Sequence, residues 1–373
     1  MSNLKWVVFL GFSCFLANTL SAQPLAELIK RYDQTFSANE PGGTILIKKG
    51  EQIIWQKAYG IANLATNEKV TENTIFNTGS ISKTIVAYGV LILAESQKLS
   101  IDDPINQYFD FKNPTITADI TIRHLLSHTS GLPDARNVRN NPKFYLTAKD
   151  QANFDPILQI NQLNFPAGER FQYSNPAFNG LALIIEKVAQ QSWQQFIHEQ
   201  IFQPAGMTQS KITNGPNPQT GVAHAYVSNS GKYIERDYGE EPTFAAAGNG
   251  GIWCSILDLA KYEKAIQNHL FAKEATIQLS RQIFQPNNWG NTGNPAGVGH
   301  SWFIKEKDNP SNSYGVNIYS HTGSQGGFRS FYIAVPEKDL LYVALFNRPV
   351  SNMNQLIWEG LTLIQAANWF AEK

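Results

Sequence analysis

GVNIYSHTGSQGGFRSFYIAVPEKDLLYVALF, residues 315 to 346, carries the clearest structural signal in the chain. β-Branched and aromatic residues concentrate in three runs, Gly315 to His321, Phe328 to Val335 and Leu340 to Phe346. Glycine, proline and charged residues separate the runs, which is typical of consecutive antiparallel strands joined by short turns. A fourth run, His300 to Lys305, precedes them and predicts one more strand.

The N-terminal part of the chain contains strand patterns of the same kind. Thr44 to Lys49 and Gln52 to Tyr59 are β-rich runs around a Lys-Gly-Glu turn, which predicts a hairpin. The long middle of the chain has helical periodicity instead, clearest at Ile122 to Leu126 and Ala177 to Val188. We therefore expect an α/β fold of the α+β type. Its antiparallel sheet is shared by both ends of the chain and flanked by the terminal helices, with a largely helical lobe inserted between the strands.

Three helices are expected around these strands. Apolar residues from Leu25 to Phe36 recur at helical spacing, and the Pro-Gly-Gly break at Pro41 to Gly43 ends the pattern. Ser80 to Glu95 returns to helical spacing, and a closing helix is expected from about Asn352 to Phe370.

Composition narrows the class of protein. The chain has 373 residues, of which 42% are hydrophobic and 12% aromatic, enough to bury a large core. Lys plus Arg and Asp plus Glu number 30 each and no basic run stands out, so nothing points to nucleic acid or to a polybasic membrane patch. We expect a small molecule or a peptide as the partner, and no nucleic acid.

Residues 1 to 22 have the layout of a secretory signal peptide. Lys5 precedes an apolar run from Trp6 to Ala17, and small residues stand at Ser21 and Ala22, where we expect cleavage. The run is shorter than the roughly 20 residues of a spanning helix, so no transmembrane span is expected after signal removal. The alternative is an uncleaved anchor. The layout predicts a periplasmic or extracellular protein in which Cys254 is the only thiol, so no intramolecular disulfide is expected.

Ser80-Ile81-Ser82-Lys83 stands where a loop ending in glycine becomes a helix. The spacing puts Lys83 one turn along from Ser80 on the same face, and the serine N–H is free to donate at the helix N-terminus. Serine is a poor nucleophile until a base takes its proton, and a lysine partly desolvated in a cleft can help. Taken alone, the pattern favours a capping serine beside a solvated lysine.

Two further motifs carry polar groups suited to the same chemistry. Tyr173 to Asn175 (YSN) is expected on a loop before a helix, where the tyrosine hydroxyl can relay a proton and the Asn175 amide can hold a substrate carbonyl. The alternative is a buried tyrosine beside a capping asparagine. His321 to Gly323 (HTG) is expected to end a strand, and the glycines of Ser324 to Gly327 let a substrate backbone approach closely.

In this order, these three motifs resemble those of the penicillin-binding-protein and class C β-lactamase superfamily of serine hydrolases. Leu125 to Pro133 (LLSHTSGLP) and Ala247 to Ala260 (AGNGGIWCSILDLA) resemble scaffold segments of the same family. The resemblance spans roughly residues 25 to 370 and implies a β-lactamase/transpeptidase-like fold. It implies one catalytic domain over residues 23 to 373, with a sheet lobe of about 23–79 and 298–373 and a helical lobe of about 80–297.

The resemblance implies a role for each motif residue. Ser80 would be the acylated nucleophile, and Lys83 and Tyr173 would share its activation, with the general base left open between them. Substrate would be bound by Asn175, His321, Thr322 and Gly323, and the oxyanion hole would be the backbone N–H groups of Ser80 and Ser324. No metal or organic cofactor is implied. The implied activity is cleavage of D-alanyl peptides, β-lactams or small esters. The alternative is a catalytically idle penicillin-binding sensor or scaffold module.

His321 departs from the lysine that opens the third motif in class C β-lactamases. The variant is closer to secreted DD-carboxypeptidases, D-amino-acid peptidases and some esterases of the superfamily. Histidine has an unperturbed pKa of about 6.5, so two interpretations stay open. A protonated ring would attract a substrate carboxylate, whereas a neutral ring would serve hydrogen bonding or packing alone.

Other signals are weaker. His124 and His128 are four residues apart, but no acidic or cysteine partner has matching spacing, so we interpret them as scaffold. Cys254 stands in an apolar run and is interpreted as a buried, inert thiol. Arg329 either reaches a substrate carboxylate or is solvated on the sheet. Specificity is expected to depend on two loops, residues 136–154 and 284–297.

Overall fold

The structure is a computed structural model, described here for residues 12–136, 149–212, 215–216, 221–236, 243–244, 247–284 and 297–369. The chain divides into two compact units, Met1–Ser37 with Val350–Lys373, and Ala38–Pro349. Residues 1–11 of the predicted signal peptide lie outside the described residues. So do residues 137–148 and 285–296 of the two predicted specificity loops.

The smaller unit contains two helices from opposite ends of the chain, α1 (Phe12–Thr35) and α11 (Met353–Ala366). Arg31 of α1 donates to Glu27 at 3.0 Å and to Glu359 of α11 at 2.5 Å. Both helices were expected. α1 begins upstream of the expected cleavage point at Ala22, and α11 ends four residues before the predicted limit.

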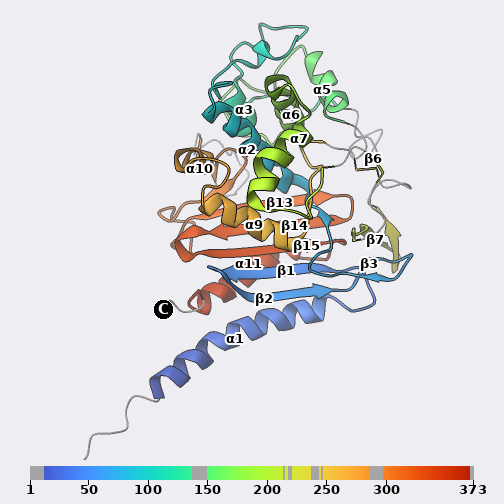
Figure 1. The fold of residues 1–373 in the computed structure, drawn as a ribbon, viewed down its shortest axis with the longest axis vertical. Coiled ribbons are helices and arrows are strands. Elements are labelled where there is room, and N and C mark those ends of the chain that lie inside the picture. The colour runs from blue at the N-terminus through green and yellow to red at the C-terminus, as the bar shows by residue number, and fades with distance from the viewer. Residues whose placement is uncertain are drawn as a thin grey trace, which may run out of the picture. The chain divides into compact units, whose positions relative to one another are not determined.

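The larger unit is built on a sheet that contains seven strands in the described residues, in the order β11-β12-β13-β14-β15-β1-β2 (Figure 1). Every neighbouring pair is antiparallel. The strands are β1 (Gly43–Lys49), β2 (Gln52–Tyr59), β11 (Gly297–Val298), β12 (Phe303–Lys305), β13 (Ile318–Gln325), β14 (Phe328–Val335) and β15 (Leu340–Phe346). β1 pairs with β15 so that Gly43 lies opposite Phe346, which confirms that both β-rich regions share one sheet.

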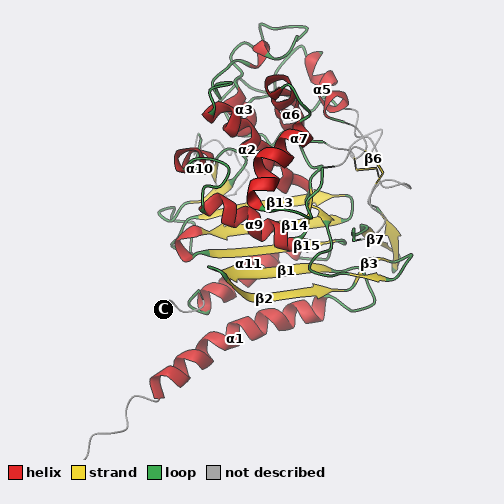
Figure 2. Ribbon diagram, in the orientation of Figure 1, coloured by secondary structure: helices red, strands yellow, loops and turns green. Residues whose placement is uncertain are grey.

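The helical lobe is inserted between β2 and β11 (Figure 2). Its helices are α2 (Ser82–Glu95), α3 (Ile122–Leu126), α5 (Asp150–Leu158), α6 (Asn175–Ala189), α7 (Trp193–Ile197), α8 (Gln203–Ala205), α9 (Ile256–Gln267) and α10 (Glu274–Ser280). α2 contacts α6, and α9 packs on β15 and β1. Every residue of α2 from Ser82 to Leu91 is buried, as expected of a helix that is apolar on nearly all sides.

Four short two-stranded pairs in the described residues stand apart from the main sheet. They are β3 (Ile61–Asn63) with β4 (Glu68–Lys69), β5 (Phe76–Asn77) with β10 (Trp253–Cys254), β6 (Gly215–Pro216) with β9 (Thr243–Phe244), and β7 (Tyr226–Asn229) with β8 (Lys232–Glu235). The β5–β10 pair matters most for the site, because it holds the segment before Ser80 beside the segment after Asn249.

One detail differs from the sequence-based expectation. The HTG motif does not end its strand: β13 continues to Gln325, which pairs with Phe328 of β14. The reason is that the hairpin turn needs only Gly326 and Gly327, with Gly326 at φ +53°.

Within the described part of the chain, every helix is too short or too polar to cross a bilayer.

Candidate active site

Ser80 lies in a single turn of 3-10 helix, Gly79–Ile81, that leads into α2. Gly79 has φ +52°, a left-handed conformation that glycine adopts without strain. A Cβ atom on Gly79 would lie 2.7 Å from the backbone nitrogen of Ser324. Glycine is therefore required here for two reasons, the backbone angle and the close approach to β13.

β13 approaches the same turn from its own side. A Cβ atom on Gly323 would lie 2.0 Å from the carbonyl oxygen of Thr78. Ser330, opposite Gly323 on β14, donates its hydroxyl to that same oxygen at 2.6 Å. These contacts hold the turn that carries Ser80 against the part of β13 that carries Ser324, the two residues whose backbone N–H groups were predicted to form an oxyanion hole.

Lys83 lies one helical turn after Ser80. Its Nζ is 3.0 Å from Ser80 Oγ and 2.5 Å from the carbonyl oxygen of Asn249. The side chain is fully buried, and burial lowers the pKa of Lys83 well below its usual value, with the positive charge of Arg136 acting in the same direction. The amine is thus driven toward its neutral form, which can accept a proton from the serine.

Tyr173 borders the site from the loop before α6. Its ring centroid is 5.0 Å from Lys83 Nζ, and about a third of the residue is exposed. Ser174 is the N-cap of α6, since its hydroxyl accepts from the Ala177 N–H, so Asn175 is not the cap that one alternative expected. Asn175 is the first residue of α6 and is half-buried.

The imidazole ring of His128 packs against the ring of Tyr173. The two rings stack with centroids 4.4 Å apart and planes 24° apart. His128 Nδ1 accepts from the backbone N–H of Ser174 at 3.0 Å, so the loop that carries Tyr173 is held by ring and backbone together. His128 was interpreted as scaffold because no acidic or cysteine partner has matching spacing, and the sequence could not indicate its contacts with Ser174 and Tyr173, which lie on a distant loop. Its left-handed backbone, with φ +58°, leaves no signal in a single sequence.

His321 is 2% exposed on β13, with its ring 6.4 Å from that of Tyr173. Nδ1–H donates to the carbonyl oxygen of Thr322 at 2.7 Å, which leaves Nε2 as an acceptor with no partner among the described residues. Burial lowers the pKa of His321 to about 3, and positive charge on Lys83, when the amine is protonated, acts in the same direction. The geometry therefore favours the neutral ring, one of the two interpretations that the sequence left open.

Thr322 and Ser324 are exposed on β13, whereas Gly323 between them is buried. This alternation is that of a strand with one face toward the core. The exposed pair is accessible to a substrate lying along the strand.

Behind Lys83 lies a buried polar chain that the sequence did not indicate. Asp150 Oδ1 accepts from Asn179 Nδ2 at 2.7 Å and from the Gly248 N–H at 2.8 Å. Asn179 Nδ2 is also 3.2 Å from Asn249 Oδ1, and the carbonyl of Asn249 binds Lys83. Asn249 and Gly248 belong to a segment that was recognised as scaffold, but the partners on α5 and α6 lie far away in sequence.

The weaker signals have structural explanations. His124 Nδ1 accepts from the Thr121 N–H at 3.1 Å and closes the capping box of α3. Cys254 is buried, which raises its pKa to about 12 and makes the thiol inert. Arg329 donates to the carbonyls of Gly326 and Phe328 at 3.0 and 2.6 Å, at the hairpin turn. Among the described residues, no three His, Cys, Asp or Glu side chains cluster as metal ligands would.

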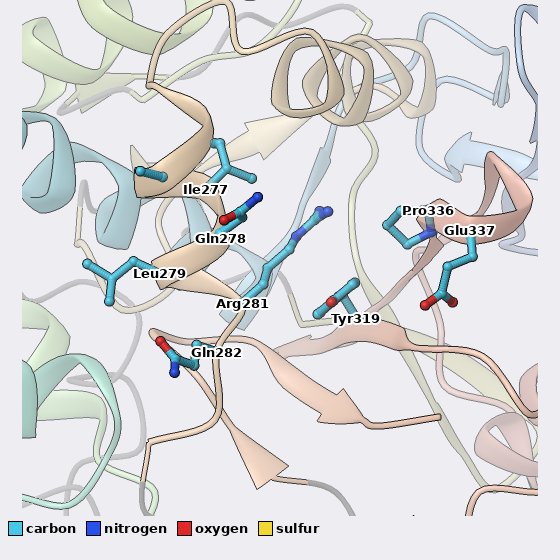
Figure 3. A pocket seen from close by; sticks show the side chains of 9 residues that line it. Ile277, Gln278, Leu279, Arg281, Gln282, Tyr319, Pro336 and Glu337 are labelled. Atoms are coloured by element: carbon cyan, nitrogen blue, oxygen red, sulfur yellow. The ribbon is translucent and has the colours of Figure 1, made fainter. Parts of the chain in front are cut away.

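A groove of about 820 Å³ lies away from these residues (Figure 3). Residues of α10 line one side of the groove, and Pro336 and Glu337 line the other. Arg281 and Tyr319 lie between them. None of Ser80, Lys83 and Tyr173 lines it, so the groove is separate from the candidate active site.

Comparisons with known proteins indicate the family and the fold of the chain. The model of a family described as Beta-lactamase matches residues 25–367. A penicillin-binding protein of Bacillus subtilis (strain 168) is 28% identical over 319 residues, which are 81% of this chain and 67% of that protein. The chain spans 59% of the length of another curated relative, Protein flp of Staphylococcus aureus (strain MW2), at 25% identity.

Solved structures share the fold. A penicillin-binding protein from Bacillus halodurans superposes with a TM-score of 0.75 at 25% identity, covering 92% of this chain and 98% of that one. A D-amino acid amidase from Ochrobactrum anthropi SV3, complexed with L-phenylalanine amide, superposes with a TM-score of 0.73 at 19% identity, covering 94% and 99%. The second likeness, at its low identity, concerns the fold alone.

Proposed function

We infer a function from a shared ancestry: the chain belongs to the Beta-lactamase family, whose members are generally serine hydrolases. We propose that it cleaves amide or ester bonds through an acyl-enzyme on Ser80. The observation that carries the proposal is the 3.0 Å contact between Lys83 Nζ and Ser80 Oγ, made by an amine that is fully buried. A lysine whose pKa is lowered by burial can accept the proton of an adjacent serine hydroxyl. In the alternative, a purely capping serine, the neighbouring lysine would be solvated, whereas Lys83 is fully buried.

The proposed acylation begins when Ser80 Oγ attacks the substrate carbonyl carbon and its proton passes to the Lys83 amine. The carbonyl oxygen becomes an oxyanion, which the backbone N–H groups of Ser80 and Ser324 would stabilise. When the carbon–nitrogen or carbon–oxygen bond breaks, the leaving group takes back the proton. Tyr173 would relay it, and the ring centroid 5.0 Å from Lys83 Nζ supports this role.

Deacylation repeats the sequence with water as the nucleophile. Water attacks the ester carbon, its proton goes to the Lys83 and Tyr173 pair, and Ser80 Oγ leaves and recovers a proton. We assign the base role first to Lys83, because its amine contacts the serine hydroxyl directly and its pKa is lowered. Tyr173 would be the second member of the unit, and Asn175 would orient the substrate carbonyl from the start of α6.

We propose a D-amino-acid amide or peptide as the substrate class, with β-lactams and small esters as further candidates. Support comes from the penicillin-binding relatives. A neutral His321 would give a substrate carboxylate a weak field, so Thr322 would hold that group mainly by hydrogen bonding. Export to the periplasm or the exterior follows from the signal-like residues 1 to 22 and is likewise a proposal.

The test is covalent labelling of the purified mature protein and of Ser80→Ala. Intact-protein and peptide mass spectrometry after exposure to a fluorophosphonate and to a fluorescent penicillin should find the adduct on Ser80 and none in the variant. A hydrolysis panel of nitrocefin, D-Ala-D-Ala peptides, D-aminoacyl anilides and p-nitrophenyl esters would then identify the substrate class. Reversible binding of penicillin without any adduct would instead indicate the idle sensor or scaffold module.

A further inference from the structure

We propose that Asp150 is a positioning residue for Lys83. Its carboxylate anchors the backbone at Gly248 and Asn249, so that the Asn249 carbonyl oxygen is fixed beside the lysine amine. This inference rests on the proposed function, because the position of an amine matters only if it moves protons.

The contacts form one continuous path. Asp150 Oδ1 accepts from the Gly248 N–H at 2.8 Å, and the next residue, Asn249, accepts from Lys83 Nζ at 2.5 Å. A second branch runs through Asn179, which donates to Asp150 at 2.7 Å and lies 3.2 Å from the Asn249 side chain. Asp150, Asn179 and Asn249 are 3%, 0% and 6% exposed, so water does not replace these bonds.

Packing makes the segment sensitive to its anchor. A Cβ atom on Gly248 would lie 2.7 Å from Ala182 Cβ and 2.8 Å from the Phe178 carbonyl oxygen, so the segment lies directly against α6. Loss of the carboxylate would leave the Gly248 N–H buried without an acceptor, and the backbone would move to find one. Any such movement carries the Asn249 carbonyl away from Lys83.

The carboxylate is needed as an acceptor more than as a charge. Burial raises the pKa of Asp150 to about 7, against the opposing hydrogen bonds from Asn179 and Gly248 and with a contribution from Glu186. The group is therefore partly protonated at neutral pH. Asparagine, which keeps an oxygen in the same place, is the matching neutral side chain.

Three variants separate positioning from general damage. Asp150→Ala removes the acceptor and Asp150→Asn keeps an oxygen. Asp155→Ala removes an exposed carboxylate from the same helix and is the matched control. Each is measured with a p-nitrophenyl ester for kcat, KM and the pH profile of kcat/KM from pH 5 to 9, and by thermal unfolding.

We expect Asp150→Ala to lower kcat about tenfold or more with KM within about twofold, because small displacements of a proton-transfer group reduce the rate strongly. The acid limb of the profile should also move to lower pH. The Asn249 carbonyl stabilises the ammonium form, so its loss lowers the pKa of Lys83 further. The other titratable or charged groups facing Lys83, namely Arg136, His128, His321 and Tyr173, are unchanged. Asp150→Asn should recover most of the rate and the original limb.

The outcomes are distinct. No adduct on Ser80 in the unmodified protein would overturn the proposed function itself. Normal acylation there, with Asp150→Ala equal to Asp155→Ala, would overturn the positioning role alone. Equal losses in Asp150→Ala and Asp150→Asn without a shift of the acid limb would show a merely structural role. If Asp150→Ala does not fold, Asn179→Ala breaks the second branch and should move the acid limb in the same direction. An unmoved limb there overturns the proposal.

Discussion

Substitution of Gly79 by alanine would test the close approach on which the candidate site depends. The backbone at Gly79 is left-handed, with φ +52°, which costs an L-residue about 1 kcal/mol. The new Cβ would lie 2.7 Å from Ser324 N and 3.1 Å from two atoms of Gly323, shorter than van der Waals contact. The turn and β13 must therefore move apart by some tenths of an ångström, and the backbone N–H groups of Ser80 and Ser324 move with them.

The rate effect can be separated from the stability effect. Loss of one oxyanion donor costs about 100- to 1,000-fold in kcat, so partial displacement of both should cost Gly79→Ala about 10- to 100-fold. Gly206→Ala is the matched control, because Gly206 has φ +68° and a Cβ there meets nothing within 4 Å. Gly206→Ala should lose about 1 kcal/mol of unfolding free energy, and Gly79→Ala should lose more, because its Cβ also clashes with β13. Only Gly79→Ala should lose kcat on a p-nitrophenyl ester. Equal kcat values in the two would refute the reasoning.

Three further predictions concern the motif residues. Ser80→Ala should reduce kcat at least about 10⁴-fold with an unchanged unfolding midpoint; retained turnover would exclude Ser80 as the nucleophile. Lys83→Ala and Tyr173→Phe should be non-additive in a double-mutant cycle of kcat/KM, whereas losses that simply add would show two independent groups. Because burial holds the pKa of His321 near 3, the ratio of kcat/KM for D-Ala-D-Ala peptides to that for neutral esters should stay flat from about pH 5.5 to 8.5. A ratio that falls as pH rises would mean that substrate binding protonates the ring. Because the unfolded chain protonates His321 near pH ~6.5 and the folded chain only near 3, the contribution of His321 to stability is present above pH ~6.5 and is lost as pH falls toward 3. The free energy of unfolding in urea should therefore fall less between these pH values in His321→Asn than in the unmodified protein.

The strands and the main helices were predictable because each carries its own local pattern. Runs such as Phe328 to Val335 coincide with β14, and Gln52 to Tyr59 coincides with β2. The end of β13 was not predictable, because its extension to Gln325 depends on pairing with β14 rather than on its own residues. The position at which a strand ends can thus depend on its partner strand.

Some features of the candidate site were likewise predictable from the sequence, and others were not. The contact between Ser80 and Lys83 was predictable because helical spacing puts the two residues together, and the 3.0 Å distance agrees with that spacing. Their proposed catalytic roles rested on the resemblance of all three motifs to those of the family. The protonation of His321 was not identifiable, since it depends on burial that only the folded chain creates. The contacts of His128, which was interpreted as scaffold, and of Asp150, which was not singled out, were not predictable, because their partners, Ser174 and Gly248, lie on segments that tertiary structure alone brings close.

The pairing of β1 with β15 has a consequence for how the protein acquires its structure. Gly43 and Phe346 are paired, although nearly the whole sequence of the larger unit separates them. Thr78 and Ser330 are likewise in contact although they lie far apart in sequence. Loops of this length close slowly, and their ordering entropy is lost before the pairings compensate for it. A growing chain therefore cannot assemble the candidate site until β13 and β14 have emerged and folded back. Its exposed β1 edge remains open to mispairing until β15 arrives.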